Sequence, residues 1–208
     1  MAKVYFTPYG VGLGHASRLI MLAEGLGTRG VASRFSSFGE AAEYISSLGY
    51  GCNLVPSMEF VWTTEGHFSI TSSIAKIPEY FVNFTRQVNH ELRNLKEFDP
   101  DVVVSDTRLS PVIASKILNI PSIVVLNQVR LLLSPKLRKY KLARSFEAIN
   151  GEFLGLVWTL TDKILVPDLP PPYTISQNNI WGTNSIRNKL KYVGFASPRT
   201  AVTEENVK

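Results

Sequence analysis

The chain has 208 residues, of which 45% are hydrophobic and 19% are charged, and it carries a net charge of +5. This composition is typical of a globular protein, and at this length about 70% of the unfolded chain's surface can be buried in one domain. The single cysteine, Cys52, excludes an internal disulfide and suits a reducing cytoplasm, and no signal peptide or run of ~20 apolar residues predicts export or a membrane span.

Apolar, β-branched runs alternate with helical patterns from the start of the chain. The predicted elements of the first part are strand 4–8, helix 15–30, strand 32–38, helix 40–48 and strand 52–55. A polar, aromatic-rich loop follows over residues 56–72.

The second part continues the alternation, with a helix that ends at Phe98 and then a short apolar strand that ends in a carboxylate, Asp106. The later predicted elements are strand 101–106, helix 109–118, strand 121–126, helix 145–161, strand 163–166 and strand 191–193. Residues 1–196 are expected to form the domain, and the polar residues 197–208 a linker or frayed end.

Strands that alternate with helices of ten or more residues predict an α/β fold, a doubly wound, Rossmann-like parallel sheet with helices on both faces. In such a sheet the strand order reverses beside the first strand, so the fourth strand pairs with the first, and a crevice opens at their carboxyl ends. The loops at this crevice carry His15 and Asp106. Since adjacent strands lie ~4.8 Å apart, these two side chains are expected within hydrogen-bonding reach.

Three glycines, Gly10, Gly12 and Gly14, separate the first strand from the first helix and directly precede His15. A glycine turn at a helix N-terminus exposes backbone N–H groups and a positive dipole end, which favour phosphate. A histidine backed by an aspartate acts as a general base on a hydroxyl. The structural alternatives are that His15 caps the helix or fills the core, and that Asp106 caps the helix beginning near Leu109.

Several other chemistries lack their motifs. No G-x-S-x-G elbow supports a serine nucleophile. A dinucleotide fingerprint would place His15 at its third glycine, and no Lys-Ser or Lys-Thr completes a P-loop. His67 and His90 are too scattered for a metal site, and none is expected. A base beside a phosphate-binding loop therefore points to group transfer from a phosphate-containing donor.

The segment Gly10-Val-Gly-Leu-Gly-His-Ala-Ser-Arg18, together with Val104-Ser-Asp106 and Asn127-Gln128, resembles the amino-terminal domain of GT-B glycosyltransferases, in the archaeal MurG-like, family 28-like group. The resemblance spans about residues 3–198. It implies a hexosyltransferase in which this half binds the acceptor, while a carboxyl-terminal half, absent here, binds a nucleotide sugar, often a UDP-sugar, without a metal or other cofactor. This chain alone is then expected to be inactive.

The same resemblance assigns roles to individual residues. His15 matches the catalytic base, Asp106 the acid that orients it, and Gly12 and Gly14 the loop that faces the donor diphosphate. On the acceptor side it implies contacts from Asn127 and Gln128. Arg18, one turn into the helix, is predicted from its position to contact an anionic acceptor or donor, with a surface salt bridge as the equal alternative.

The chain also departs from MurG itself. MurG has glycine at the position of Leu13 and proline at that of Arg18, and its Glu-Gln-Asn motif matches Asn127-Gln128 only in part. The acceptor, a glycan, lipid or small molecule, therefore cannot be taken from MurG.

Residues 129–146 hold six basic residues and no acid, interleaved with leucines. Such a segment suits an anionic membrane surface, and it equally suits a solvated helix that buries its leucines in the core. The apolar residues of 80–84 are predicted to be core. An alternative function is thus a non-catalytic membrane-docking subunit that recruits a separate donor-binding chain. The expected location is cytoplasmic or peripheral on the inner membrane face, with no nucleic-acid partner.

Overall fold

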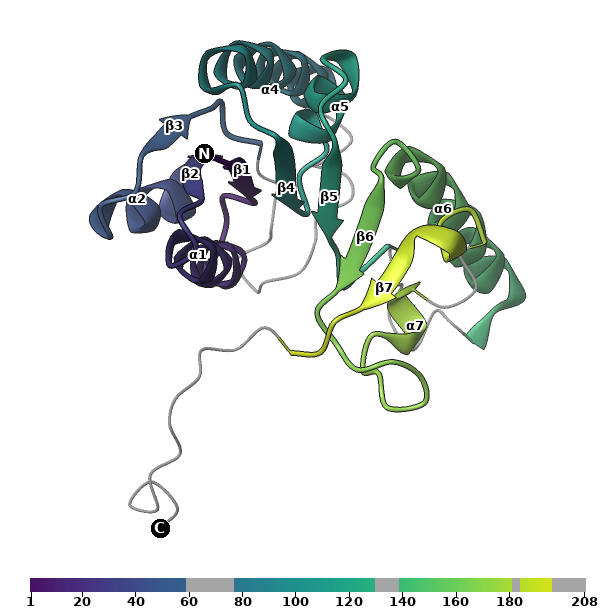
Figure 1. Ribbon diagram of the computed structural model, residues 1–208. Coiled ribbons are helices and arrows are strands. Elements are labelled where there is room, and N and C mark those ends of the chain that lie inside the picture. The colour runs from purple at the N-terminus through teal and green to yellow at the C-terminus, as the bar shows by residue number, and fades with distance from the viewer. Residues whose placement is uncertain (59–76, 130–138, 181–183, 196–208) are drawn as a thin grey trace, which may run out of the picture.

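The computed structural model describes residues 1–58, 77–129, 139–180 and 184–195 (Figure 1). Within these residues the strands form one seven-stranded, entirely parallel sheet in the order β3-β2-β1-β4-β5-β6-β7. The strands are β1 (Lys3–Pro8), β2 (Ala32–Ser37), β3 (Cys52–Leu54), β4 (Val102–Asp106), β5 (Ser122–Val125), β6 (Lys163–Val166) and β7 (Leu190–Tyr192). Each lies within one residue of its predicted bounds, and the predicted doubly wound α/β sheet is confirmed.

The main helices also follow the prediction. They are α1 (Leu13–Gly27), α2 (Gly39–Ser47), α4 (Ile77–Phe98), α5 (Ser110–Ile117) and α6 (Lys141–Trp158). Helix α6 begins four residues before the predicted start at residue 145. The sequence did not reveal α7 (Gln177–Ile180) or the 3-10 helix η2 (Arg187–Lys189), because each is too short to give a helical period.

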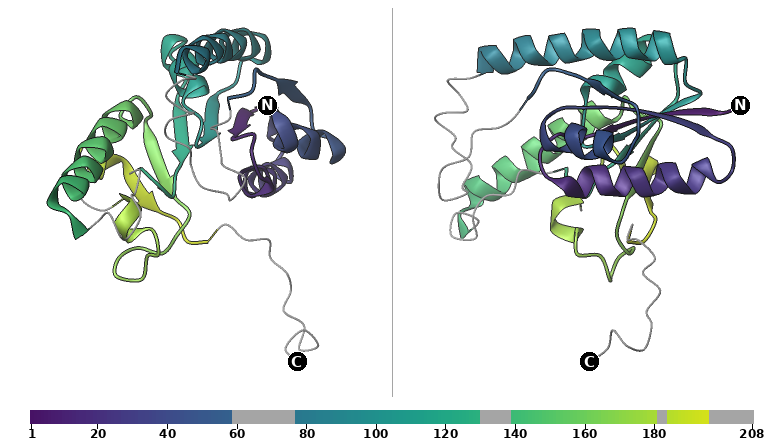
Figure 2. Two further views of the ribbon diagram at one scale, coloured as in Figure 1. Left: turned by 180° about the vertical axis from the view of Figure 1, so that it is seen from behind. Right: turned by 90° about the vertical axis from the view of Figure 1, so that its left-hand side faces the viewer.

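The helices cover the two faces of the sheet as separate layers (Figure 2). Val104 and Val125 pack in one core cluster with side chains of α1 and α2. Their chain neighbours, Val103 and Val124, point to the other face, where they pack with α4, α5 and α6. This alternation is the two-residue period of a strand, so near-continuous valine runs fill both cores.

The pairing of β1 with β4 brings together the two loops that carry the predicted site. Their register sets Pro8 beside Asp106, and the Tyr9 N–H donates to the Asp106 carbonyl at 3.1 Å. Both strands therefore end at the same level, next to the amino terminus of α1.

The prediction that the apolar residues of 80–84 belong to the core is wrong. Phe81 is 73% exposed and Val82 is also exposed, while Phe84 lines a cavity. The first turns of α4 project past the carboxyl end of the sheet (Figure 2, right), so no strand lies beneath them.

Asp168 organises the turn that follows β6. Its carboxylate is buried and accepts hydrogen bonds from the N–H of Leu169, the hydroxyl of Thr174 and the N–H of Ser176, at 2.7, 2.7 and 2.9 Å. Burial alone would raise the pKa of Asp168, but these hydrogen bonds to the charged form outweigh it and lower the pKa to about 2.

Replacing Asp168 with asparagine is expected to lower the free energy of unfolding at pH 7 by roughly 1–3 kcal/mol, because bonds to a charged acceptor are lost. The folded-state pKa lies below the ordinary value of about 3.9, so this stabilisation is present above about pH 4 and disappears as the pH falls toward 2. Urea unfolding at pH 7 and across that window measures both effects. Equal stability of variant and wild type at pH 7 would contradict this role.

Candidate active site

The structure brings His15 and Asp106 together, although they are 91 residues apart. His15 lies in the first turn of α1, and Asp106 is the last residue of β4. The imidazole Nδ1 lies 2.7 Å from Asp106 Oδ1. The carboxylate is 1% exposed and the histidine side chain 25% exposed, so the acid is buried behind a ring that reaches the surface.

Two further donors hold the carboxylate of Asp106. Arg18 Nε binds Oδ2 at 2.8 Å, and the hydroxyl of Thr107 donates to Oδ1 at 3.0 Å. Thr107 has φ +64°, a conformation that costs energy for a β-branched residue and is typical of functional sites. The local structure thus fixes the position of the acid on both oxygens.

The capping alternatives are wrong. The N-cap of α5 is Leu109, and no side chain donates or accepts a capping bond there, so Asp106 does not cap that helix. The N-cap of α1 is Gly12, again without a side-chain cap, so His15 does not cap its helix either. Because its side chain is partly exposed, His15 is not a core residue either.

The hydrogen bond with Asp106 decides which nitrogen of His15 is available. An ionised carboxylate only accepts hydrogen bonds, so Nδ1 carries the proton and donates. The other ring nitrogen, Nε2, then keeps its lone pair. In this state the imidazole can take a proton from a hydroxyl placed beside it, and the carboxylate stabilises the imidazolium that forms.

The three glycines of the loop serve different purposes. A Cβ on Gly10 would lie 2.2 Å from the ring of Phe38 and 2.5 Å from its carbonyl oxygen, so only glycine fits there. Gly12 has φ +74°, in the left-handed region that glycine adopts readily. A Cβ on Gly12 or Gly14 would meet no described atom within 4 Å, so both face open space. Helix α1 has no acidic residue in its first turn, and its amino-terminal dipole is not neutralised by a side chain there.

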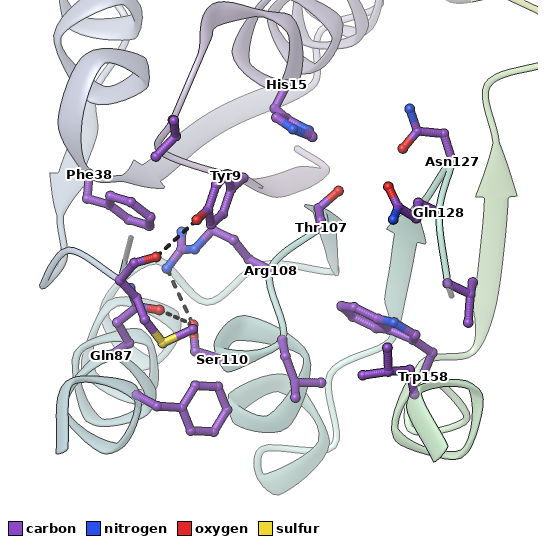
Figure 3. Close-up of a pocket in the computed structure, with 16 residues that line it drawn as sticks. Tyr9, His15, Phe38, Gln87, Thr107, Arg108, Ser110, Asn127, Gln128 and Trp158 are labelled. Atoms are coloured by element: carbon purple, nitrogen blue, oxygen red, sulfur yellow. Dashed lines mark hydrogen bonds between the residues drawn. The ribbon is translucent and has the colours of Figure 1, made fainter. Parts of the chain in front are cut away.

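A cavity of about 450 Å³ opens beside His15 (Figure 3). Figure 3 shows His15 and Thr107 facing Asn127 and Gln128 across it, with Gln87 and Ser110 at the far side. Apolar side chains make most of its wall, and they include Phe38, Met58, Phe84, Val129, Leu154 and Trp158. The walls come from α1, α4, α5, α6 and the loops after β1, β2, β3, β4 and β5.

A buried polar network lies behind the wall of this cavity and reaches it through Arg108. Arg108, 3% exposed, pairs with the fully buried Glu91 of α4 through Nη2 and Oε1 at 2.6 Å. Glu91 also accepts from the Ser36 and Tyr5 hydroxyls, at 2.7 and 3.1 Å, and Arg108 Nη1 donates to the Ser36 carbonyl at 2.9 Å. Burial is the main cause that raises the pKa of Tyr5, and the negative charge of Glu91 raises it further. The phenol therefore stays neutral and donates.

Sequence reasoning missed this network. Arg108 and Glu91 lie 17 residues apart on different elements, and a charged residue in a helical pattern reads as solvent-exposed. The one available signal was the position of Arg108, two residues after the carboxyl end of a buried strand that already held a candidate acid.

The other predicted site residues are placed as follows. Asn127 and Gln128 line the cavity and are exposed. Arg18 binds Asp106 and is not among the lining residues. Residues 130–138 of the basic segment and residues 59–76, most of the aromatic loop, lie outside the described residues.

In the described part of the chain no group of three or more His, Cys, Asp and Glu side chains is arranged to hold a metal ion. The same part contains no helix whose length and apolar content would let it cross a bilayer.

Comparison with known proteins identifies the family. Residues 2–149 match the profile of Glycosyl transferase family 1. The chain is 32% identical to an uncharacterized glycosyltransferase of Methanosarcina acetivorans and to another of Methanosarcina mazei, in each case over 92% of this chain and 50% of the relative. The chain thus spans about half the length of the curated relatives it matches.

Solved structures show the same fold at low identity. MurG of Acinetobacter baumannii superposes with a TM-score of 0.54 at 10% identity, over 84% of this chain and 44% of that one. The UDP-GlcNAc 2-epimerase of Neisseria meningitidis gives a TM-score of 0.54 at 15% identity, over 93% and 47%. By profile and fold together, the chain belongs to Glycosyl transferase family 1 and forms an amino-terminal domain of the GT-B type.

Proposed function

We propose that this chain is the acceptor-binding half of a hexosyltransferase that moves a sugar from a nucleotide sugar, UDP-linked, to an acceptor hydroxyl. The observation that carries the proposal is the His15–Asp106 pair at the wall of an open cavity. A general base can act only where a hydroxyl can reach it. The cavity beside His15 is open to such a hydroxyl.

In the proposed reaction His15 Nε2 removes the proton of the acceptor hydroxyl as its oxygen attacks the anomeric carbon. A new C–O bond forms, and the bond from that carbon to the diphosphate breaks. The nucleoside diphosphate leaves with the electron pair. Asp106, held by Arg18 and Thr107, keeps the imidazole oriented and balances its positive charge.

The donor diphosphate is proposed to lie at the amino terminus of α1. Gly12 and Gly14 leave open space there, and the uncapped N–H groups and the dipole favour an anion. Among the structural neighbours, the Neisseria epimerase is bound to UDP-GlcNAc, and a Staphylococcus aureus protein of TM-score 0.54 and 12% identity is described as an MnaA-UDP co-structure. These neighbours support a nucleotide-sugar donor. No further cofactor is proposed.

The acceptor is proposed to have an apolar or aromatic body with a hydroxyl at one end. The apolar wall suits such a body, while Asn127, Gln128 and Thr107 supply the few polar contacts that orient a ligand. Arg18 remains a candidate contact for an anionic group, because only its Nε is used by Asp106.

An assay of nucleoside diphosphate release tests the proposal. The active enzyme that includes this chain, given a panel of UDP- and TDP-sugars with phenols or primary alkanols as acceptors, is expected to release UDP only when both substrates are present. The 208-residue chain alone is expected to release none, since the donor-binding part is proposed to lie in the other half of the relatives' length. Acceptor-independent release, or none under any condition, would contradict the proposal.

A second candidate is a non-catalytic membrane-docking subunit that recruits a donor-binding chain. It is favoured by exposed basic residues just before α6 and in its first turn, namely Lys139, Lys141 and Arg144. In this case His15 takes no part in a reaction. Replacing His15 therefore distinguishes the two functions, because it stops sugar transfer only if His15 is the base.

A further inference from the structure

Thr107 places a hydroxyl beside the proposed base. It follows Asp106 at the carboxyl end of β4, and its exposed side chain lines the cavity. Its hydroxyl donates to Asp106 Oδ1 at 3.0 Å, and His15 Nδ1 lies 2.7 Å from the same oxygen. The Thr107 hydroxyl and the imidazole are therefore neighbours, separated by no more than these two hydrogen bonds laid end to end.

The bond to Asp106 leaves the Thr107 oxygen with acceptor capacity only. A hydroxyl has one proton and two lone pairs, and an ionised carboxylate can only accept, so the proton of Thr107 points to Asp106. No donor among the described residues reaches the Thr107 oxygen. A group that enters the cavity can therefore bind this oxygen only by donating a hydrogen bond to it.

The backbone at this position does not favour threonine. Thr107 has φ +64°, and its N–H donates to the Val125 carbonyl at 3.3 Å. Glycine or asparagine adopts this conformation at lower cost than a β-branched residue does. Residues in such conformations cluster at binding and active sites, which indicates that the hydroxyl of Thr107 has a role there.

More polar groups surround His15 than one reacting hydroxyl can use. Asn127 and Gln128 follow β5, which pairs with β4, and both line the cavity with exposed side chains. Figure 3 shows them facing His15 and Thr107, while apolar side chains make most of the remaining wall. A few polar groups fix the orientation of a ligand in such a pocket, so this end suits the polar head of an otherwise apolar molecule.

We propose that the acceptor is a vicinal diol, and that Thr107 accepts a hydrogen bond from the hydroxyl next to the reacting one. The reacting hydroxyl donates to His15 Nε2, and its neighbour donates to Thr107 Oγ1. Hydroxyls on adjacent carbons lie close enough together to reach two neighbouring acceptors at once, whereas a single hydroxyl leaves one of these acceptors unused. Thr107 then selects the acceptor and determines which of its hydroxyls meets the base. This inference rests on the proposed function, because it takes His15 as that base.

Matched ligands test the inference on the purified chain, with dissociation constants measured by saturation-transfer NMR. The ligands are 3-phenylpropane-1,2-diol, 3-phenylpropan-1-ol, which lacks the second hydroxyl, and 2-methoxy-3-phenylpropan-1-ol, which keeps the second oxygen without its proton. The wild type is expected to bind the diol about fivefold more tightly than either of the others, an effect of the size that one hydrogen bond gives.

Three variants separate the hydroxyl of residue 107 from its shape. Thr107→Val keeps the β-branched shape without the hydroxyl and is expected to bind all three ligands equally, while Thr107→Ser keeps both the hydroxyl and the preference for the diol. The matched control is Thr28→Val, an exposed threonine at the far end of α1 whose hydroxyl donates to the Gly25 carbonyl, and it is expected to behave like the wild type. If Thr107 only supported Asp106, its replacement would change the affinity for all three ligands alike and leave their ratio unchanged.

Binding is measured without a sugar donor, so its outcome does not depend on whether sugar is transferred. Equal affinity of the wild type for the diol and the monoalcohol, no binding of the diol at about 10 mM, or an unchanged preference in Thr107→Val would overturn the inference and leave the proposed function standing. Loss of the preference in Thr107→Ser would also overturn it, since the hydroxyl would then not be the cause. With the preference intact, an absence of transfer to any acceptor would instead contradict the proposed function and leave the assignment of Thr107 standing.

Discussion

Replacing His15 with alanine is expected to lower the turnover of the active enzyme about 10²-fold or more, with little change in KM. The variant removes the group that is proposed to take the acceptor proton, and loss of a general base has effects of this size. Steady-state kinetics at saturating donor and acceptor measure the effect.

The His15 variant is also a clean test of mechanism. Asp106 keeps its ion pair with Arg18 and its bond from Thr107 when the imidazole is gone, so the site's acid stays paired. The matched control is His90→Ala on α4, a half-buried histidine that does not line the cavity, and it is expected to keep wild-type turnover. Turnover of the His15 variant within about threefold of wild type would remove His15 from the reaction.

Replacing Glu91 with glutamine is expected to lower the free energy of unfolding by about 3–5 kcal/mol. The change keeps the shape of the side chain and creates no cavity, but it leaves the charge of Arg108 buried and uncompensated. The urea midpoint at pH 7, with an unchanged slope, measures this loss.

The control is Glu97→Gln on the same helix, because Glu97 is exposed and its replacement is expected to change stability by less than about 0.5 kcal/mol. A second variant sharpens the test. Since a buried pair can often be replaced by apolar residues at little cost, Glu91→Leu/Arg108→Met is expected to be more stable than Glu91→Leu alone. Wild-type stability of Glu91→Gln would show that the pair does not hold α4 in place.

The strands and the His15–Asp106 contact could be predicted because each depends on a strong local signal or on topology. Runs such as Val102–Asp106 are apolar enough to be buried on both faces, which identifies parallel strands. Once the strand order is known, the ends of β1 and β4 must be neighbours. The convergence of the two side chains follows from that order and needs no knowledge of side-chain packing.

The side-chain pairings of the site and the exposure of the first turns of α4 could not be predicted, because they depend on how elements pack together. Sequence periodicity does not encode that packing. The sequence predicts a substrate anion or a surface salt bridge for Arg18, whereas the structure pairs Arg18 with the buried carboxylate of Asp106. The Glu91–Arg108 pair joins α4 to the loop after β4, and nothing in either local pattern indicates the other. Likewise, the apolar residues near Phe81 read as core because periodicity cannot tell where a helix extends beyond its sheet.

Asp106 receives His15 on one oxygen and Arg18 on the other, and these two donors lie three residues apart on α1. The two contacts join the first turns of that helix to the end of β4. A rotation of α1 about its axis would strain the hydrogen bond of His15 and the ion pair of Arg18 together. The distance between the proposed anion site at the helix tip and the imidazole is therefore set before any ligand arrives, and we expect binding at one point to leave the other in place.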